Sequence, residues 1–257
     1  MKDPKKRFSD RAEDYARHRP GYPREILGFL EDKSALFSDS VVADVGSGTG
    51  NLGALFLERG NKVLAIEPND EMRCAAERRF GGHPRFESVA GSAEATTLPD
   101  ESVDLVVVAN SLHWVDRSAA RVEFSRILKP EGHVAVVWSI AKKTGRPFLE
   151  AYNRLVSRYR TDDGAGGNSK DVYEMTEALF GDSDGKQDYE VGRFEYSQRL
   201  DSEGLKGLVL SSSSMPAETE LDSVEMLRDL EELFRAHESG GEVVMEYVVT
   251  VYCGPLS

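Results

Sequence analysis

The stretch Asp-Val-Gly-Ser-Gly-Thr-Gly at residues 44–50 decides the fold of this chain. It follows an apolar run at residues 41–45 and precedes a segment in which Leu52, Leu55 and Phe56 have helical spacing. Glycine at every second position allows positive φ in a tight turn and lets a ligand lie against the backbone. Free amides at the start of the following helix face such a ligand. The stretch therefore predicts a strand–turn–helix unit that binds an adenosine-bearing cofactor.

The segment from 41 to 140 alternates apolar strand patterns with amphipathic helices. The strand candidates lie at residues 41–45, 62–66, 85–89, 103–109 and 134–140. We expect Asp70 and Ser118 to cap two of the helices and Glu131-Gly132 to turn the chain into the last strand. Continuous apolar strands separated by helices predict a parallel sheet covered on both faces. Ligands bind at the carboxyl ends of such strands, where the glycine turn lies.

The flanking segments predict additions to this sheet. Residues 189–200 and 243–252 alternate as antiparallel strands do, and a long helix between them carries Leu221, Val224, Leu227, Leu230 and Phe234. The predicted fold is α/β: a Rossmann-like doubly wound sheet, mostly parallel, of seven strands with an antiparallel edge strand, plus N-terminal and inserted helices. We expect one domain over 1–257. Its parts are a helical lid at 1–38, a cofactor-binding core at 40–140, a helical insertion over the substrate site at 142–188, and strands and helices at 189–257 that complete the sheet. Within the lid we expect helices near 9–18 and 25–30. Within the insertion we expect a mobile loop at 161–170.

Composition limits the partners and the compartment. The net charge of -13 disfavours nucleic acid and anionic lipid as partners, because an acidic surface repels both. No apolar run approaches the roughly 20 residues that cross a bilayer, and the basic cluster at residues 2–7, interpreted as a solvated tail, has no apolar stretch behind it. Cys74 and Cys253 are too few for a disulfide framework, and no spacing suggests a metal site. We expect a cytoplasmic protein; its oligomeric state is not indicated.

Glu67 ends the second strand candidate, where the ribose-binding acid of such folds lies. Its carboxylate can accept hydrogen bonds from both ribose hydroxyls, and a surface acid at a strand end is the alternative interpretation. Pro68 follows it, and Met72 on the next helix is placed to cover one face of an adenine ring, or simply to pack in the core.

The glycines alone leave two cofactors open. Residues 48–53 also satisfy the dinucleotide pattern G-x-G-x-x-G, which a nicotinamide-dependent dehydrogenase uses. Asp44, two residues before the first glycine, suits a cofactor with a positively charged amino-acid end, whereas it would repel a pyrophosphate.

The set Asp44-x-Gly-x-Gly-x-Gly with Glu67 resembles the class I S-adenosylmethionine-dependent methyltransferases. Further matches are Gly91-Ser92-Ala93-Glu94 before the fourth strand and the segment 127–132 before the fifth. The resemblance covers residues 40–140 strongly, and it implies that the turn holds the methionine part, Glu67 the ribose and residues 92–94 the adenine edge. Ser92 departs from the Asp of many members, so the adenine contact stays open between Ser92, the Ala93 backbone and Glu94. The implied cofactor-binding residues are Tyr15, Arg19, Asp44, Gly46, Ser47, Gly48, Gly50, Glu67, Pro68, Met72, Ser92, Ala93, Glu94 and Asn110.

The segment Asn-Ser-Leu-His-Trp at 110–114 resembles the His-Trp variant of small-molecule members similar to trans-aconitate methyltransferase. The N-terminal residues 8–23 resemble the same branch, which implies that Tyr15 and Arg19 close the site and that Arg19 pairs with the cofactor carboxylate. A helix packed only for stability is the alternative. His113 is the candidate for acid–base catalysis because histidine ordinarily has a pKa near neutrality, and a role in shaping the pocket is equally compatible with the sequence.

Absent motifs narrow the function further. No Asn-Pro-Pro-aromatic motif and no cysteine follow the fourth strand, and the chain has no serine hydrolase elbow and no Gly-Lys-Ser/Thr phosphate loop. We therefore predict an enzyme that transfers a methyl group from S-adenosylmethionine to oxygen, nitrogen or carbon of a small molecule. A nicotinamide-dependent oxidoreductase and a non-catalytic cofactor-binding interaction protein remain the alternatives.

Overall fold

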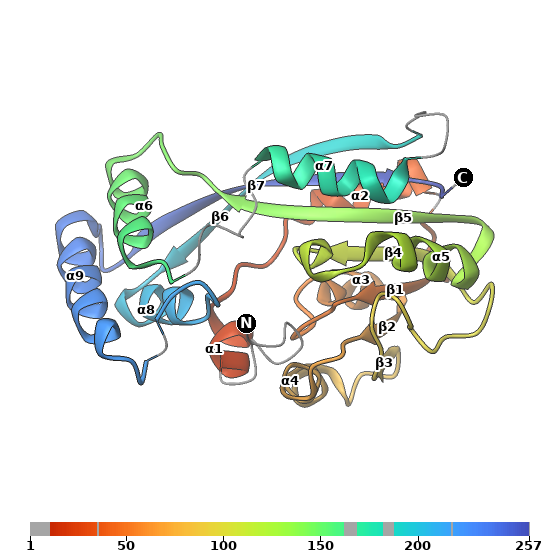
Figure 1. The fold of residues 1–257 in the computed structure, drawn as a ribbon, viewed down its shortest axis with the longest axis horizontal. Coiled ribbons are helices and arrows are strands. Elements are labelled where there is room, and N and C mark those ends of the chain that lie inside the picture. The colour runs from red at the N-terminus through yellow and green to blue at the C-terminus, as the bar shows by residue number, and fades with distance from the viewer. Residues whose placement is uncertain (1–10, 35, 162–168, 182–187, 217, 257) are drawn as a thin grey trace.

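The computed structural model describes residues 11–34, 36–161, 169–181, 188–216 and 218–256, whose strands form one seven-stranded sheet (Figure 1). The strands are β1 Val41–Val45, β2 Lys62–Ile66, β3 Phe86–Val89, β4 Val103–Ala109, β5 Leu128–Ala141, β6 Glu190–Leu200 and β7 Val243–Gly254. Their order is β3-β2-β1-β4-β5-β7-β6, in which β1 to β5 pair in parallel and β7 runs antiparallel to both neighbours. The predicted fold is confirmed, with the antiparallel strand one place in from the edge.

The described helices surround this sheet and add a group beside it. They are α1 Ala12–His18, α2 Glu25–Ser34, α3 Gly53–Arg59, α4 Asp70–Phe80, the 3-10 turn η3 Leu112–Trp114, α5 Arg117–Ile127, α6 Pro147–Tyr159, α7 Ser169–Phe180, α8 Ser202–Leu210 and α9 Leu221–His237. Helix α8 was not predicted. The basic cluster at 2–7 and the loop at 162–168 lie outside the described residues.

Side chains alternate between the two faces of the central strands. Val106 and Val108 of β4 point to the face covered by α5 and α7, with Phe124 at its centre. Leu105 and Val107 of the same strand point to the opposite face, where Leu30 of α2 and Phe56 of α3 cover them. A further core joins α6, α8 and α9 beside the start of β7, at the left in Figure 1. Burial on both faces explains why the central strands read as continuous apolar runs.

Both predicted helix caps were wrong by one or two residues. Asn69 caps α4, because its side chain accepts from the Met72 amide at 2.9 Å, and Asp70 is already helical. Asp116 caps α5 by accepting from the Ser118 and Ala119 amides. In each case the capping residue has extended backbone angles, which place its side-chain oxygen over the first free amides.

Two further predictions need correction. The predicted turn at Glu131-Gly132 lies inside β5, which begins at Leu128, and the β4–β5 register shifts there. A Cβ at Gly132 would lie 2.8 Å from a Leu128 methyl, so glycine permits this bulge rather than a turn. On α9, Val224 is 70% exposed although its spacing predicted a core position.

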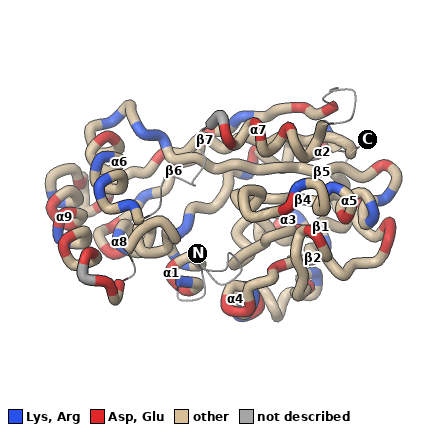
Figure 2. The backbone as a smooth tube through the Cα atoms, viewed as in Figure 1, with Lys and Arg blue, Asp and Glu red and all other residues tan. Residues whose placement is uncertain are grey.

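Figure 2 shows that charged residues are spread along the backbone. Several of opposite sign form ion pairs between elements. Arg158 of α6, for example, donates to Asp229 and Glu225 of α9. Of the helices in the described part, none combines the length and the apolar character that crossing a bilayer requires.

Glu123 attaches the loop after β3 to α5. Its carboxylate accepts from the Thr96 amide at 2.8 Å, from the Thr96 hydroxyl at 2.5 Å and from the Arg126 guanidinium at 2.7 Å. The hydrogen bond from Arg126 is the largest cause that lowers the pKa of Glu123 to about 2. The ionised form therefore holds this loop in place.

We expect Glu123→Gln to lower the free energy of unfolding by about 1–3 kcal/mol at pH 7. The pKa of Glu123 is lower in the folded state than its ordinary 4.5, so its contribution is complete above pH 4.5 and is lost as the pH falls towards 2. Urea unfolding from pH 2.5 to 7 measures this. The exposed Glu131→Gln serves as the control, and a difference between wild type and E123Q that does not change with pH would contradict the prediction.

Candidate functional site

The glycine turn links β1 to α3 with three residues at positive φ. Gly46, Gly48 and Gly50 have φ of 67°, 57° and 81°. A Cβ on Gly46 would lie 2.6 Å from the Ser111 hydroxyl, and one on Gly50 would lie 2.8 Å from the Phe80 ring. Gly46 and Gly50 are thus fixed by packing. A Cβ on Gly48 would instead make only ordinary van der Waals contact, with the Met72 and Tyr15 side chains at 3.8 and 3.9 Å.

Glu67 connects this turn to the end of β2. One carboxylate oxygen accepts from the Gly48 amide and the other from the Asn69 amide, both at 2.9 Å. The side chain is 8% exposed, and burial raises its pKa while the two amide bonds oppose the rise. Each oxygen keeps a second lone pair, so the carboxylate can still accept from a ligand diol.

Asp44 is the most deeply buried acid at the turn. Its Oδ2 accepts from the Gly53 amide at 3.0 Å at the start of α3, and 1% of the residue is exposed. Burial raises the pKa of Asp44 to about 7, and the neighbouring charge of Glu67 adds to the rise. A cation beside this carboxyl would favour its ionised form.

Two cavities adjoin the turn, with volumes of about 210 Å³ and about 650 Å³. Both are lined by Tyr15, Gly46, Gly48, Ala109, Asn110 and Trp114, so they meet at the turn. The structure brings nearly all the predicted cofactor residues together here. The smaller cavity is also lined by Glu67, Pro68, Asn69, Met72, Ser92, Ala93 and Glu94, and the larger by Arg19, Asp44, Ser47 and His113. Gly50 lines neither cavity; its positive φ and its close packing against Phe80 shape the turn.

The loop after β3 closes the smaller cavity. Ser92 and Ala95 exchange backbone hydrogen bonds at 3.0 and 3.2 Å, and Ala93 between them is 5% exposed. The Glu94 carboxylate accepts from the Asp116 amide at 2.9 Å. One Glu94 oxygen therefore already has a structural partner at the start of α5.

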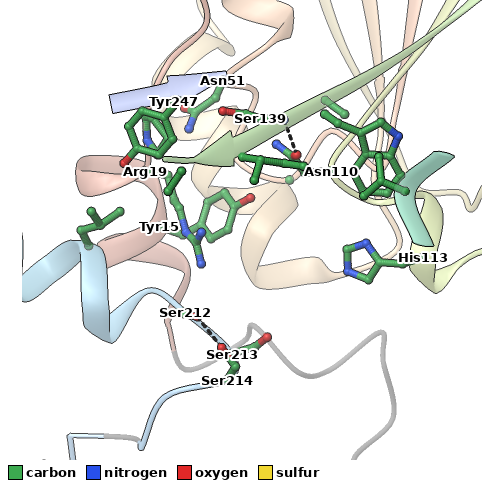
Figure 3. Close-up of a pocket in the computed structure, with 18 of the residues that line it drawn as sticks. Tyr15, Arg19, Asn51, Asn110, His113, Ser139, Ser212, Ser213, Ser214 and Tyr247 are labelled. Carbon is green, nitrogen blue, oxygen red and sulfur yellow. Dashed lines mark hydrogen bonds between the residues drawn. The ribbon is translucent and has the colours of Figure 1, made fainter. Parts of the chain in front are cut away.

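Asn110 is fixed by three hydrogen bonds at the carboxyl end of β4. Its Oδ1 accepts from the Ser139 amide at 2.8 Å (Figure 3). Its backbone amide donates to the Val137 carbonyl, and its Nδ2 donates to the Tyr22 hydroxyl at 2.9 Å. The residue has φ of 51°, a left-handed conformation that is uncommon outside glycine. Strain of this kind is typical of binding sites.

Tyr15 and Arg19 come from the N-terminal segment and lie on one side of the larger cavity in Figure 3. The guanidinium carbon of Arg19 lies 5.0 Å from the centre of the Tyr15 ring, and one NH₂ donates to the Ser211 carbonyl at 3.2 Å. Within the described part of the chain no Asp or Glu pairs with Arg19, and its buried Nε has no hydrogen-bond partner.

His113 lies on the opposite side of the cavity, on η3 (Figure 3). Its ring centre is 4.6 Å from that of Trp114 and 6.0 Å from that of Trp138, which it stacks against. The Trp138 ring is held in turn, because its Nε1 donates to the Thr176 hydroxyl at 3.0 Å. The position suits either a proton acceptor or an aromatic wall.

Several lining residues were not predicted. They are Tyr22, Ser139, Tyr152, Ser212, Ser213, Ser214 and Tyr247. Ser139 follows the rule that ligands lie at carboxyl ends of parallel strands, so β5 offered a signal for it. Tyr247 reaches the same edge because β7 runs antiparallel to β5 and pairs Tyr247 with Ala141. The alternating pattern predicted the antiparallel direction but not this register.

The residues present fit S-adenosylmethionine in two respects. Buried Arg19 Nε, Ser47 Oγ and Ser139 Oγ have no hydrogen-bond partner among the described residues, and all three residues line the larger cavity. The smaller cavity has apolar side chains from Met72 and Ala93 with the Glu67 carboxylate beside them, the chemistry that an adenosine group requires.

Comparison with known proteins finds similarity to methyltransferases. A model described as a methyltransferase domain matches residues 43–136. An uncharacterised methyltransferase-like protein of Schizosaccharomyces pombe is 33% identical over 61% of this chain, and the match spans 60% of that protein's length. An uncharacterised methyltransferase of Geobacillus sp. (strain WCH70) is 31% identical over 59% of this chain and 74% of that protein.

The chain belongs to the class I S-adenosylmethionine-dependent methyltransferases. Membership identifies S-adenosylmethionine as the methyl donor. The fold of this methyltransferase agrees with a solved structure from Anaeromyxobacter dehalogenans, described as a candidate type II methyltransferase. That likeness has a TM-score of 0.70 at 20% identity and covers 93% of this chain and 98% of the other.

We expect Asp44→Asn to stabilise the ligand-free methyltransferase at pH 8. The pKa of Asp44 is about 7 in the folded state against an ordinary 3.8. Between these pH values the carboxyl ionises in the unfolded chain but stays protonated in the fold, so the fold loses stability as the pH rises. The gain in free energy of unfolding should grow from zero near pH 4 to about 2–4 kcal/mol at pH 8. Urea unfolding measures it, with the exposed Asp39→Asn as the control; a gain that is absent at pH 8 would refute the role assigned to burial.

Proposed function

We propose that this methyltransferase transfers a methyl group from S-adenosylmethionine to a small anionic molecule held in the larger cavity. The observation that carries the proposal is the pair of cavities that meet at the glycine turn, one with the chemistry of an adenosine site and one large enough for a second molecule. When bound, S-adenosylmethionine supplies a methyl group already activated by its positively charged sulfur.

The cofactor's adenosine belongs in the smaller cavity. Glu67 would accept from the ribose hydroxyls, and Met72 and Ala93 would cover the adenine faces. The adenine edge would be read by Ser92 or by the Ala93 backbone in preference to Glu94, because Glu94 already accepts from the Asp116 amide. The remaining cofactor contacts that we propose come from Tyr15, Gly46, Ser47, Gly48, Pro68 and Asn110.

The amino-acid end of the cofactor carries one positive and one negative group. Asp44 and Arg19 both line the larger cavity next to the turn and form no ion pair with each other in the described structure. Asp44 would hold the ammonium group and Arg19 the carboxylate, which would give the buried carboxyl and the half-buried guanidinium each a partner of opposite charge.

The acceptor class follows from the charges around the larger cavity. Its lining includes Arg19, Lys142, Lys143 and Arg160, whereas Asp44 is the one acidic residue among the described lining residues. Lys142 is partly neutralised by Glu195 and Glu246. A positively lined cavity in a chain of net charge -13 favours an acid of low molecular weight over nucleic acid, whose phosphates would meet the acidic exterior. Such an acceptor agrees with the small-molecule branch similar to trans-aconitate methyltransferase.

The chain's own residues would position the acceptor and shield it from water. Holding it in line at contact distance supplies most of the rate increase expected for methyl transfer. His113 would receive a proton where the acceptor atom has one to lose. The segments at 1–38 and 142–188 would cover the site as a lid and an insertion that selects the acceptor. Cys74 and Cys253 are both free, as a cytoplasmic setting would require.

Glu67→Gln should weaken binding of S-adenosylhomocysteine about tenfold, because a neutral amide accepts more weakly from the ribose hydroxyls than a carboxylate does. Isothermal titration calorimetry measures the affinity, with the exposed Glu87→Gln as the control. Wild-type protein that binds reduced nicotinamide dinucleotide but not S-adenosylhomocysteine would overturn the proposed function in favour of an oxidoreductase.

Lys143→Gln and Arg160→Gln should each raise the KM for an acidic acceptor about five- to tenfold while leaving the affinity for S-adenosylhomocysteine unchanged, since one favourable charge contact is removed in each case. The acceptor is first found by incubating the protein with methyl-labelled cofactor and a panel of organic acids, their amides and neutral analogues. Lys33→Gln on α2 is the control. Transfer to neutral analogues alone would refute the anionic class, and cofactor binding without any transfer would favour a non-catalytic role.

A further inference from the structure

Helix α1 is held at its first turn by Arg11. The Arg11 guanidinium donates to the carbonyls of Leu210 at 3.3 Å and Met215 at 3.0 Å, and also to that of Ser212. These carbonyls lie at the end of α8 and in the turn that follows it. The last carbonyls of a helix have no intrahelical partner and attract cations, so Arg11 supplies a partner for the Leu210 carbonyl at the end of α8.

The other end of α1 is held by direct contact between a ring and a backbone. A Cβ built on Gly207, inside α8, would overlap ring atoms of His18. Glycine inside a helix is less favourable than alanine by about 1 kcal/mol, so this close approach accounts for its presence. The His18 carbonyl also accepts from the Gln198 side chain of β6 at 2.9 Å.

The residues of the N-terminal segment that line the cavities are close in sequence to these two contacts, which Arg11 and His18 make with α8. Tyr15, in the middle of α1, lines both cavities, and Arg19 directly follows the helix. On its other side α1 packs against α4, where Ala12 and Tyr15 meet Met72 (Figure 1). The position of α1 on α8 therefore decides whether Tyr15 covers the glycine turn. Arg11, His18 and Gly207 themselves line neither cavity.

We propose that Arg11 and Gly207 are positioning residues, which hold α1 on α8 and thereby keep the Tyr15 wall in place around the ligand. The α1–α8 contact, made by Arg11, His18 and Gly207, also joins this wall to the turn at 212–214, which lines the larger cavity. The identity of the ligand rests on the proposed function. The attachment of α1 does not, because it is measurable in the ligand-free protein.

Gly207→Ala tests the contact by placing a methyl group where the His18 ring lies. We expect the amides of α1 to exchange with deuterium about tenfold faster than in wild type, and the affinity for S-adenosylhomocysteine to fall by about the same factor. Gly28→Ala is the matched control, because Gly28 is also inside a helix but a Cβ there meets nothing within 4 Å. The double variant His18→Ala/Gly207→Ala removes the overlap and should restore most of the protection and affinity.

A second pair of variants leaves the packing untouched. Arg11→Gln should speed exchange in α1 and weaken binding of S-adenosylhomocysteine, whereas Arg17→Gln, at an exposed position of the same helix, should change neither. Unchanged α1 exchange in both G207A and R11Q would overturn the proposal, and so would faster exchange without loss of affinity. Failure of wild-type protein to bind S-adenosylhomocysteine would instead count against the proposed function, while the exchange results would still test the contact.

Discussion

Two buried carboxylates hold the glycine turn in place, and the rest of the site depends on them. Glu67 accepts from the Gly48 amide and Asp44 from the Gly53 amide, so the turn is tied to β2 on one side and to the start of α3 on the other. Burial raises the pKa of both groups, which means that the ligand-free fold tolerates an unfavourable charge there. Such a cost is expected at a binding site, because the ligand supplies the interactions that offset it.

The sheet brings distant segments to this turn. The carboxyl ends of β4 and β5 deliver Asn110 and Ser139, and the antiparallel direction of β7 delivers Tyr247 from its starting end. The Asn110 side chain links two segments at this edge of the sheet. It forms hydrogen bonds with Ser139 of β5 and with Tyr22 of the N-terminal segment. A left-handed backbone at Asn110 is tolerated because these partners determine its orientation from both sides.

The sequence predicted what local patterns determine. The bounds of β1, β2 and β4 were correct, because these strands are buried on both faces and bounded by polar residues or glycine. The caps were misplaced because Asn69 and Asp70 are both capping residue types, and only backbone geometry distinguishes them. Helix α8 was missed because Gly204 and Gly207 weaken its helical pattern, and the reason for Gly207 is a contact with His18, nearly two hundred positions earlier. The lining of the smaller cavity was predictable, because its motifs are contiguous in the sequence. Much of the lining of the larger cavity was not, because single residues from α6, β7 and the turn after α8 meet there.

The opposite charges of Asp44 and Arg19 separate the proposed cofactor position from the proposed acceptor position in the site. Asp44 is buried and Arg19 is half-buried, both beside the larger cavity, and in the described structure neither is the other's partner. A zwitterionic group offers the missing partner to each. The other cations that line the larger cavity are Lys142, which is paired with Glu195 and Glu246, and Lys143 and Arg160. They would have no counterpart on the cofactor, whose carboxylate Arg19 would match under the proposed function. Under the proposed function, their charge would face a second molecule, and an acidic acceptor would gain from meeting it there.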